Sequence, residues 1–333
     1  MIVAVLLVAF AASALLTGLV RRYALSRAVL DIPNERSLHS APTPRGGGIA
    51  IVVVVGLTHG ACVAGGLLPL ASGGAWGGAA LLLAALGWAD DRRPLPARTR
   101  LFIQLVIAFI ALAVITGAAR IGAPWPAAAA VVIGSIAFVW FVNLYNFMDG
   151  ADGLAAIQAT VAAGTLGMLA AIDGDTGVAA VALALAGASA GFLRWNRAPA
   201  RIFLGDVGSY FLGGYLGLLA CHLLARGDAI WHWLILLAPF ITDASLTLAR
   251  RILAGERWWA AHRTHAYQQL VTAGWSHARL ARAFLALCLL LMLLAAGAWR
   301  QPALAPWLAL LAYGLTATIW AMILLQRRPP PAA

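Results

Sequence analysis

The sequence predicts an all-α, polytopic membrane protein with about eleven transmembrane helices. Of its 333 residues, 62% are hydrophobic and only 11% are charged, whereas an ordinary soluble domain carries roughly 25% charged residues. All 23 basic residues are arginines, 12 residues are acidic, and the net charge is +11. The arginines lie in twos and threes between apolar runs. This pattern argues against a soluble enzyme, a nucleic-acid-binding protein and a disordered chain.

Eleven apolar runs approach the roughly 20 residues that a helix needs to cross the hydrocarbon core of a membrane. They cover residues 1–20, 46–70, 75–89, 101–118, 127–146, 154–172, 176–193, 207–225, 230–249, 281–298 and 304–325. No basic residue precedes the first run, which favours an uncleaved span over a signal peptide. The third run is short, so we expect Asp90 and Asp91 at its end to lie at or slightly inside the membrane surface.

The placement of the arginines predicts that the N-terminus lies outside the cell and the C-terminus in the cytoplasm. In this orientation 20 arginines are cytoplasmic, and only Arg120, Arg226 and Arg300 are outside. Residues 1–333 then form a single transmembrane domain, with all of its long connections on the cytoplasmic side. These cytoplasmic loops are expected at about 21–45, 90–100, 147–153, 194–206 and 250–280.

Six carboxylates lie at or within the cytoplasmic ends of apolar runs, where a charge costs several kcal/mol unless it is paired, hydrated or metal-bound. They are Asp90, Asp91, Asp149, Asp152, Asp206 and Asp243. All six are therefore candidate functional residues. The adjacent Asp90 and Asp91 repel each other, so we expect a cation beside them, either Mg²⁺ or the following Arg92 and Arg93. Asp31 lies in an arginine-rich loop, where a solvated charge explains it as well as a function does.

The fifth run ends in a block of oxygen-bearing side chains. Asn143 and Asn146 share one helical face, and Asp149 continues that face before Gly150 breaks the helix. Asp152 follows in the same block. Two amides and two carboxylates suit a metal ion or the polar edge of a base, and a structural turn is the alternative.

Two glycine-containing stretches predict phosphate contacts at helix starts. In 203–209, Asp206 lies between Gly205 and Gly208, and a helix N-terminus offers free N–H groups to an anion. We interpret it as a phosphate-and-metal corner, with an ordinary Asp helix cap as the alternative. Arg45, followed by three glycines at 46–48, also suits an anionic ligand. A close helix crossing is the alternative for these glycines.

The ninth run and the loop after it contain further candidates. Asp243 is either catalytic or paired with an arginine of a neighbouring helix. His262, Arg263 and His265 lack nearby Cys or carboxylate partners for zinc, so they suit a phosphate, with a solvated basic loop as the alternative. Four histidines stand alone and are expected to be interfacial or packed: His59, His222, His232 and His277.

Taken in order, these blocks resemble the polyprenyl-phosphate N-acetylhexosamine-1-phosphate transferase superfamily, glycosyltransferase family 4. The matching stretches are 44–48, 90–91, 143–153, 203–209 and 262–265. The last stretch has no run of consecutive histidines. It is therefore most similar to the branch that uses nucleotide sugars without a peptide, as in transferases that initiate O-antigen synthesis. The family's lysines are absent, so their roles fall to arginine or are lost.

The resemblance implies transfer of a sugar 1-phosphate from a UDP-N-acetylhexosamine to undecaprenyl phosphate, with release of UMP. It implies Mg²⁺, or Mn²⁺, as cofactor and a bacterial cytoplasmic membrane location with a cytoplasmic active site. Asp206 and Asn146 would hold the metal, and Asp90 or Asp91 would deprotonate or orient the lipid phosphate.

The resemblance assigns the remaining residues to substrate binding. Asn146 and Asp149 would hold the nucleotide, with Asn143 and Asp152 beside them, and Phe203 would stack on uracil. Arg263, His262, His265 and Arg45 would bind phosphate.

Expected partners are the two substrates and membrane lipid, without nucleic acid. Whether the chain forms a homodimer stays open, as do the identity of the sugar and a one-step or two-step reaction. A secondary transporter of an anionic solute and a non-catalytic membrane scaffold are the competing hypotheses.

Overall fold

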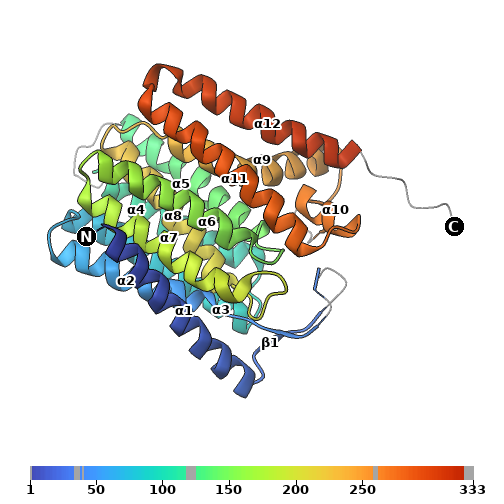
Figure 1. Cartoon of the computed structure of the whole chain (residues 1–333). Coiled ribbons are helices and arrows are strands. Elements are labelled where there is room, and N and C mark those ends of the chain that lie inside the picture. The colour runs from blue at the N-terminus through green and yellow to red at the C-terminus, as the bar shows by residue number, and fades with distance from the viewer. Residues whose placement is uncertain (1, 34–37, 40, 118–124, 258–261, 326–333) are drawn as a thin grey trace.

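The computed structural model describes residues 2–33, 38–39, 41–117, 125–257 and 262–325. Within these ranges the chain is almost entirely helical (Figure 1). The helices are α1 (Ile2–Ser26), α2 (Gly48–Ala64), α3 (Leu70–Arg92), α4 (Ala97–Ile115), α5 (Trp125–Phe147), α6 (Leu154–Ile172), α7 (Thr176–Asn196), α8 (Asp206–Ala225), α9 (Trp231–Leu253), α10 (Ala266–Thr272), α11 (His277–Arg300) and α12 (Ala305–Leu325), with a short 3₁₀ turn, η1 (Pro302–Leu304). Two short strands, β1 (Leu30–Asp31) and β2 (Thr43–Pro44), pair antiparallel.

Each of the eleven apolar runs coincides with one helix, which confirms the all-α polytopic fold. Ten helices in the described chain are long and apolar enough to cross a membrane, and α2, with 17 residues, is the shorter one. The expectation of a short third span is wrong. Helix α3 begins at Leu70 and has 23 residues, so Asp90 and Asp91 lie within its last turn.

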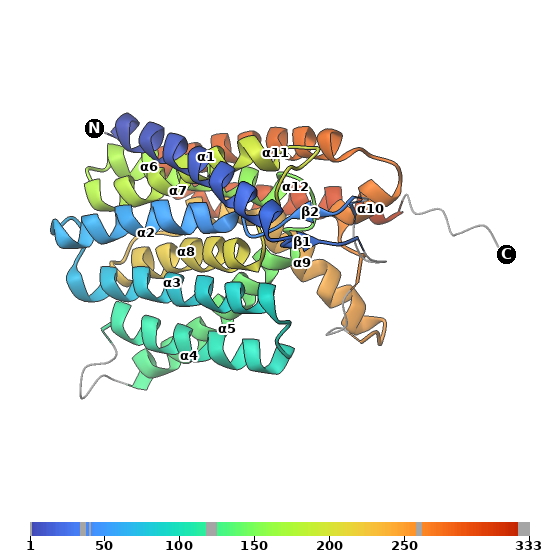
Figure 2. The same cartoon turned by 90° about the horizontal axis from the view of Figure 1, so that it is seen from below.

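Helix α8 lies at the centre of the bundle and contacts α2, α3 and α5. Figure 2 shows α8 between α2 and α3, with α4 and α5 beyond them. In its apolar window 83% of the residues are buried, against 17% in the peripheral helices α1 and α12. Because the lipid-facing helices surround α8, its first residues are held in a rigid setting.

Glycines allow two close approaches to α8. A Cβ at Gly48 would overlap the backbone of Gly208, and a Cβ at Gly87 would overlap the carbonyl of Asp206. The N–H groups of Gly47 and Gly48 donate to the carbonyls of Phe203 and Leu204, each at 2.9 Å. Gly47 and Gly48 therefore serve close packing against neighbouring elements, and the expected anion contact through their N–H groups is wrong. An added Cβ at Gly46 would meet nothing within 4 Å, but its φ of +90° favours glycine.

The ends of several helices meet at one end of the bundle, together with β1, β2 and α10 (Figures 1 and 2). Asp91 at the end of α3 contacts the start of α8, and Tyr267 of α10 contacts the end of α5. This places most of the candidate site residues in one region. Of the arginines that predict the orientation, Arg36, Arg120, Arg327 and Arg328 lie outside the described residues.

Candidate functional site

A cavity of about 330 Å³ opens at this end of the bundle and collects most of the predicted site residues. Those that line it are Arg45, Asp91, Asn146, Asp149, Asp152, Phe203 and Asp206. They come from the ends of α3, α5 and α8 and from the connections beside them. Asn143, Asp90, Asp243, His262, Arg263 and His265 are not among the lining residues.

Asp91 occupies the N-terminus of α8. Its Oδ2 accepts a hydrogen bond from the N–H of Val207 at 3.1 Å. Gly205 has φ +76°, and a Cβ there would lie 2.7 Å from the same oxygen, so the turn needs glycine. The positive end of the α8 dipole stabilises the Asp91 carboxylate. The predicted anion at this helix start is thus a side chain of the protein.

Asp90 is not among the residues that line the cavity, and it is 6% exposed. Its Oδ2 accepts from Arg100 Nη1 at 2.6 Å and from the Tyr210 hydroxyl at 3.3 Å, and its Oδ1 accepts from the N–H of Leu95 at 2.7 Å. The repulsion between adjacent carboxylates is relieved because the two side chains have different partners. The cation beside Asp90 is Arg100, which corrects the expectation of Arg92 and Arg93.

Asn146 links α5 to α8. Its amide nitrogen donates to Asp206 Oδ1 and to Ser209 Oγ, each at 2.8 Å. The amide oxygen of Asn146 is then its remaining acceptor for a metal or a substrate. Asn143, one turn earlier, donates instead to Gln104 Oε1 at 2.7 Å. It connects α5 to α4.

Asp149 follows the end of α5 and lies among other acids. Burial, with the charges of Asp206, Asp91 and Asp152, raises the pKa of its carboxyl well above the usual value. Asp152 Oδ1 lies 3.2 Å from His277 Nδ1, and its Oδ2 accepts from the N–H of Ala200 at 3.0 Å. The expectation that His277 stands alone is therefore wrong, since it lines the cavity beside Asp152.

The acids of the cavity suit a divalent cation whose coordination shell would be completed by the substrate. Five aspartates line the cavity, including Asp31, against three basic side chains, Arg45, His39 and His277. Within the described ranges, no three His, Cys, Asp or Glu side chains form a metal site by themselves. Mg²⁺ typically takes one or two protein carboxylates and fills its octahedron with phosphates and water. The donors at Asp206 and Asn146 match this pattern.

Two residues that line the cavity carry a buried nitrogen without a hydrogen-bond partner among the described residues: Arg45 Nε and His39 Nε2. Buried polar groups are normally satisfied, so these two nitrogens are candidates to bind a ligand. The His39 ring lies edge-on to Phe203, with 4.8 Å between ring centroids. His39 was missed because it is a single residue outside any recognisable block.

Asn196 and Gln268 also line the cavity and were not singled out from the sequence. Asn196 accepts from the N–H of Gly153 at 2.9 Å and donates to the Ile202 carbonyl at 3.0 Å. Asn196 therefore links the connection after α5 to the connection after α7. Its position just after an apolar run was the only sign in the sequence that it lines the site.

Asp243 holds the start of α10. Its carboxylate accepts from the N–H groups of Ala266 at 2.9 Å and Tyr267 at 3.2 Å, and lies 3.4 Å from His265 Nδ1. Asp243 thus pairs with a helix N-terminus and a histidine. No arginine pairs with Asp243 within the described ranges, so the alternative of an arginine partner is wrong there.

Three residues of this loop were expected to clamp phosphate. His265 is buried against Asp243, Arg263 is exposed, and His262 Nδ1 lies 2.9 Å from Thr264 Oγ1. Burial, with His265, Arg251 and Arg250, lowers the pKa of His262 to about 4. The Tyr267 hydroxyl donates to the Phe147 carbonyl at 2.9 Å and so joins the loop to α5.

A family model and several known proteins match this chain over much of its length. Residues 74–224 match the family described as "Glycosyl transferase family 4". A Bacillus subtilis protein named "Probable undecaprenyl-phosphate N-acetylglucosaminyl 1-phosphate transferase" is 29% identical, covering 79% of this chain and 75% of that protein. A "Decaprenyl-phosphate N-acetylglucosaminephosphotransferase" of Mycolicibacterium smegmatis is also 29% identical, over 79% and 73% of the two chains.

A second kind of relative is similar over more of its own length. A "Phospho-N-acetylmuramoyl-pentapeptide-transferase" of Desulforudis audaxviator is 32% identical, covering 78% of this chain and 85% of that protein. The matched family segment contains Asp90, Asp91, the whole 143–153 block and Asp206. With its helical membrane fold and this acidic cavity, the chain belongs to glycosyl transferase family 4.

Proposed function

We propose that the chain transfers an N-acetylhexosamine 1-phosphate from a UDP-sugar to undecaprenyl phosphate and releases UMP. The observation that carries the proposal is the cavity in which Arg45 and His39 line the same space as Asp91 and Asp206. Arg45 Nε and His39 Nε2 have no hydrogen-bond partner among the described residues. The names of the relatives, which specify polyprenyl phosphates and N-acetylglucosamine, support it. N-acetylglucosamine is therefore the first sugar to test.

The reaction needs two phosphate-bearing substrates to meet. An oxygen of the lipid phosphate attacks the sugar-linked phosphorus of the donor, and the bond from that phosphorus to UMP breaks. Asp91 is better placed than Asp90 to orient or deprotonate the lipid phosphate, because Asp91 lines the cavity and Asp90 is bound to Arg100. Arg45, with its free Nε, would hold a phosphate oxygen.

We assign Asp206 and Asn146 to a Mg²⁺ ion, with Mn²⁺ as the alternative. A bound Mg²⁺ would supply charge to offset the repulsion between the two phosphates. Asp149, which lies among other acids, would complete the acidic surface around this cation. Phe203 is assigned to the uracil ring, with His39 on its edge.

Several predicted roles remain predictions. Asp152, paired with His277, would bind the donor from one side of the cavity. His262, Arg263 and His265 would bind phosphate only after the loop changes, since none of them lines the cavity. Asn143 and Asp243 are better explained as positioning residues, through Gln104 and α10 respectively.

We infer that the cavity faces the cytoplasm of a bacterial inner membrane, in agreement with the arginine distribution. The cavity lies at the helix ends, whereas secondary transporters bind their solutes near the bilayer midplane. This location favours a transferase. Homodimer formation stays a hypothesis.

The test is a UMP-release assay with the purified full chain, undecaprenyl phosphate, Mg²⁺ and a panel of UDP-sugars. The panel contains the N-acetylglucosamine, N-acetylgalactosamine and 6-deoxy sugars, and Asp206→Asn provides the background rate. We expect UMP release that depends on the lipid with at least one sugar. No release with any sugar would refute the proposal. Solute uptake into sealed vesicles without UMP release would indicate a transporter.

A further inference from the structure

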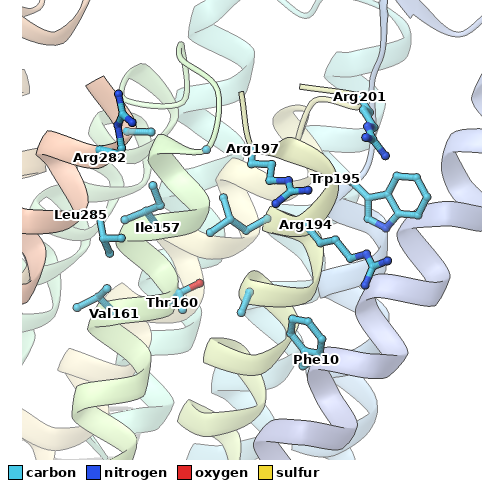
Figure 3. A pocket seen from close by; sticks show the side chains of 14 residues that line it. Phe10, Ile157, Thr160, Val161, Arg194, Trp195, Arg197, Arg201, Arg282 and Leu285 are labelled. Carbon is cyan, nitrogen blue, oxygen red and sulfur yellow. The ribbon is translucent and has the colours of Figure 1, made fainter. Parts of the chain in front are cut away.

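A second cavity lies on the lateral surface of the bundle, at the same end as the acidic cavity. It has a volume of about 670 Å³ and is lined by residues of α1, α6, α7 and α11 and of the connection after α7. Its deeper part is apolar, with Phe10, Ile157, Val161 and Leu285 in the wall (Figure 3). Val161 lies two turns into α6, so this groove descends roughly 10 Å below the helix end.

The rim of this groove is basic. Figure 3 shows the side chains of Arg197, Arg201 and Arg282 around its upper part, with Arg194 lower, on the side of Phe10. All four are exposed, and none of them forms an ion pair within the described part of the chain. No acid is among the described residues that line the groove. Four like charges that line one groove without a counter-charge favour an anion there.

The groove is distinct from the acidic cavity, although the two lie back to back. Gly153 and Arg197 line the groove, whereas the preceding Asp152 and Asn196 line the cavity. A hydrogen bond from the Gly153 N–H to Asn196 closes the wall between them. A ligand phosphate held by the arginines is therefore separated from Asp91 by this wall. The inference that follows does not depend on the proposed transferase reaction.

We propose that the groove binds an anionic phospholipid of the surrounding bilayer. The headgroup phosphate lies between Arg194, Arg197 and Arg282, and one acyl chain covers the apolar wall. Guanidinium groups bind phosphate through bidentate hydrogen bonds. Basic residues at a membrane surface also attract anionic lipids. The ring of Trp195, at the groove edge, is typical of the membrane interface. A free phosphate ion would leave the apolar wall uncovered.

The test measures lipid retention by native mass spectrometry on the purified full chain in detergent. The chain is titrated with phosphatidylglycerol and, separately, with phosphatidylcholine. We expect one phosphatidylglycerol to be retained at least tenfold more tightly than phosphatidylcholine, because arginines near the membrane surface attract an anionic lipid. The triple variant R194Q/R197Q/R282Q should lose this preference.

A matched control removes the same charge at the same end of the bundle but outside the groove: R93Q/R98Q/R257Q. These three arginines are exposed and line neither cavity. The control should retain phosphatidylglycerol as the unchanged protein does. An equal loss in both variants would show bulk charge attraction and overturn the proposal.

A second variant, Val161→Trp, fills the apolar part and leaves every arginine in place. It should lower phosphatidylglycerol retention at least tenfold. Glycerol 3-phosphate should bind to this variant as weakly as to the unchanged protein. Unchanged lipid retention would overturn the proposal. So would stoichiometric displacement of the lipid by undecaprenyl phosphate, or a dimer whose cross-links join Phe10 to Leu285 of another copy.

Discussion

The carboxylate of Asp91 accepts a hydrogen bond from the backbone N–H of Val207, 3.1 Å away, in the first turn of α8. Asp91→Asn keeps an acceptor for this bond and removes the charge. We expect a fall in kcat of at least 100-fold, the size of a general-base or electrostatic contribution. The KM for the UDP-sugar and the thermal midpoint should change little. UMP release and thermal unfolding in detergent measure these quantities.

Asp90→Asn is the matched comparison, because it removes the same charge one residue earlier. Asp90 is bound to Arg100, so its loss should lower the free energy of unfolding by about 2 kcal/mol. The double variant D90N/R100Q should recover part of that stability. If Asp90→Asn unfolds like the unchanged protein and yet abolishes turnover, Asp90 belongs among the reacting groups and our distinction between the two acids is wrong.

Asp206→Asn tests the metal assignment. The asparagine can still accept from the Asn146 amide, so the α5–α8 link should persist. Loss of the carboxylate should lower kcat and raise the Mg²⁺ concentration for half-maximal activity at least tenfold. A Mg²⁺ titration of UMP release measures both. Ser209→Ala removes the other Asn146 contact as a control. Near-normal turnover with unchanged Mg²⁺ dependence would contradict the assignment.

Gly87→Ala tests the close approach of α3 to α8. Its Cβ would overlap the carbonyl of Asp206, so α8 must shift. We expect a loss of about 1–3 kcal/mol in the free energy of unfolding and a fall in turnover. Gly78→Ala on the same helix meets nothing within 4 Å and should not destabilise the protein. Equal behaviour of the two variants in thermal unfolding would contradict this reasoning.

Asp243→Ala tests the role of Asp243 as a positioning residue for α10. Two backbone N–H groups would lose their acceptor, so residues 266–272 should exchange their amide hydrogens faster. The KM should rise more than kcat falls, and Asp243→Asn should be milder because it retains an acceptor. If Asp243→Ala abolishes kcat while hydrogen exchange in α10 is unchanged, Asp243 is catalytic.

The lowered pKa of His262 predicts that the stability of the protein depends on pH. Its pKa in the folded protein is about 4, below the value of about 6.5 for an unfolded chain. The unfolded state therefore binds more protons as the pH falls below about 6.5. Stability should be full above that pH and decline toward pH 4. His262→Asn should flatten this decline in thermal midpoints measured from about pH 7 to pH 5. Parallel curves for the two proteins would contradict the lowered pKa.

The helical architecture was predictable because the apolar runs are long and the charges are few. Most of the acidic cavity was predictable for a related reason. A carboxylate such as Asp149 or Asp206 at the end of an apolar run is costly, so its presence indicates a function. The sequence order of these blocks then suggested that they meet.

The direction of neighbouring side chains was not predictable. Asp90 and Asp91 are adjacent on α3, and only the packing of α3 against α8 decides which of them lines the cavity. His39 lies in a connection and His277 is the first residue of α11, so their approach to Phe203 and Asp152 is set by tertiary structure alone. The basic groove likewise joins residues 194–201 to Arg282, far apart in the sequence.

The enclosure of α8 has a consequence for the order of events in a catalytic cycle. A helix in contact with α2, α3 and α5 cannot tilt without separating all of them. Asp206 at its start therefore stays fixed, and substrates must adjust to it. Entry and release are then left to the connections at residues 41–47 and 262–265. The rate of turnover should accordingly respond to cross-links in these connections, and a cross-link between α8 and α3 should be tolerated.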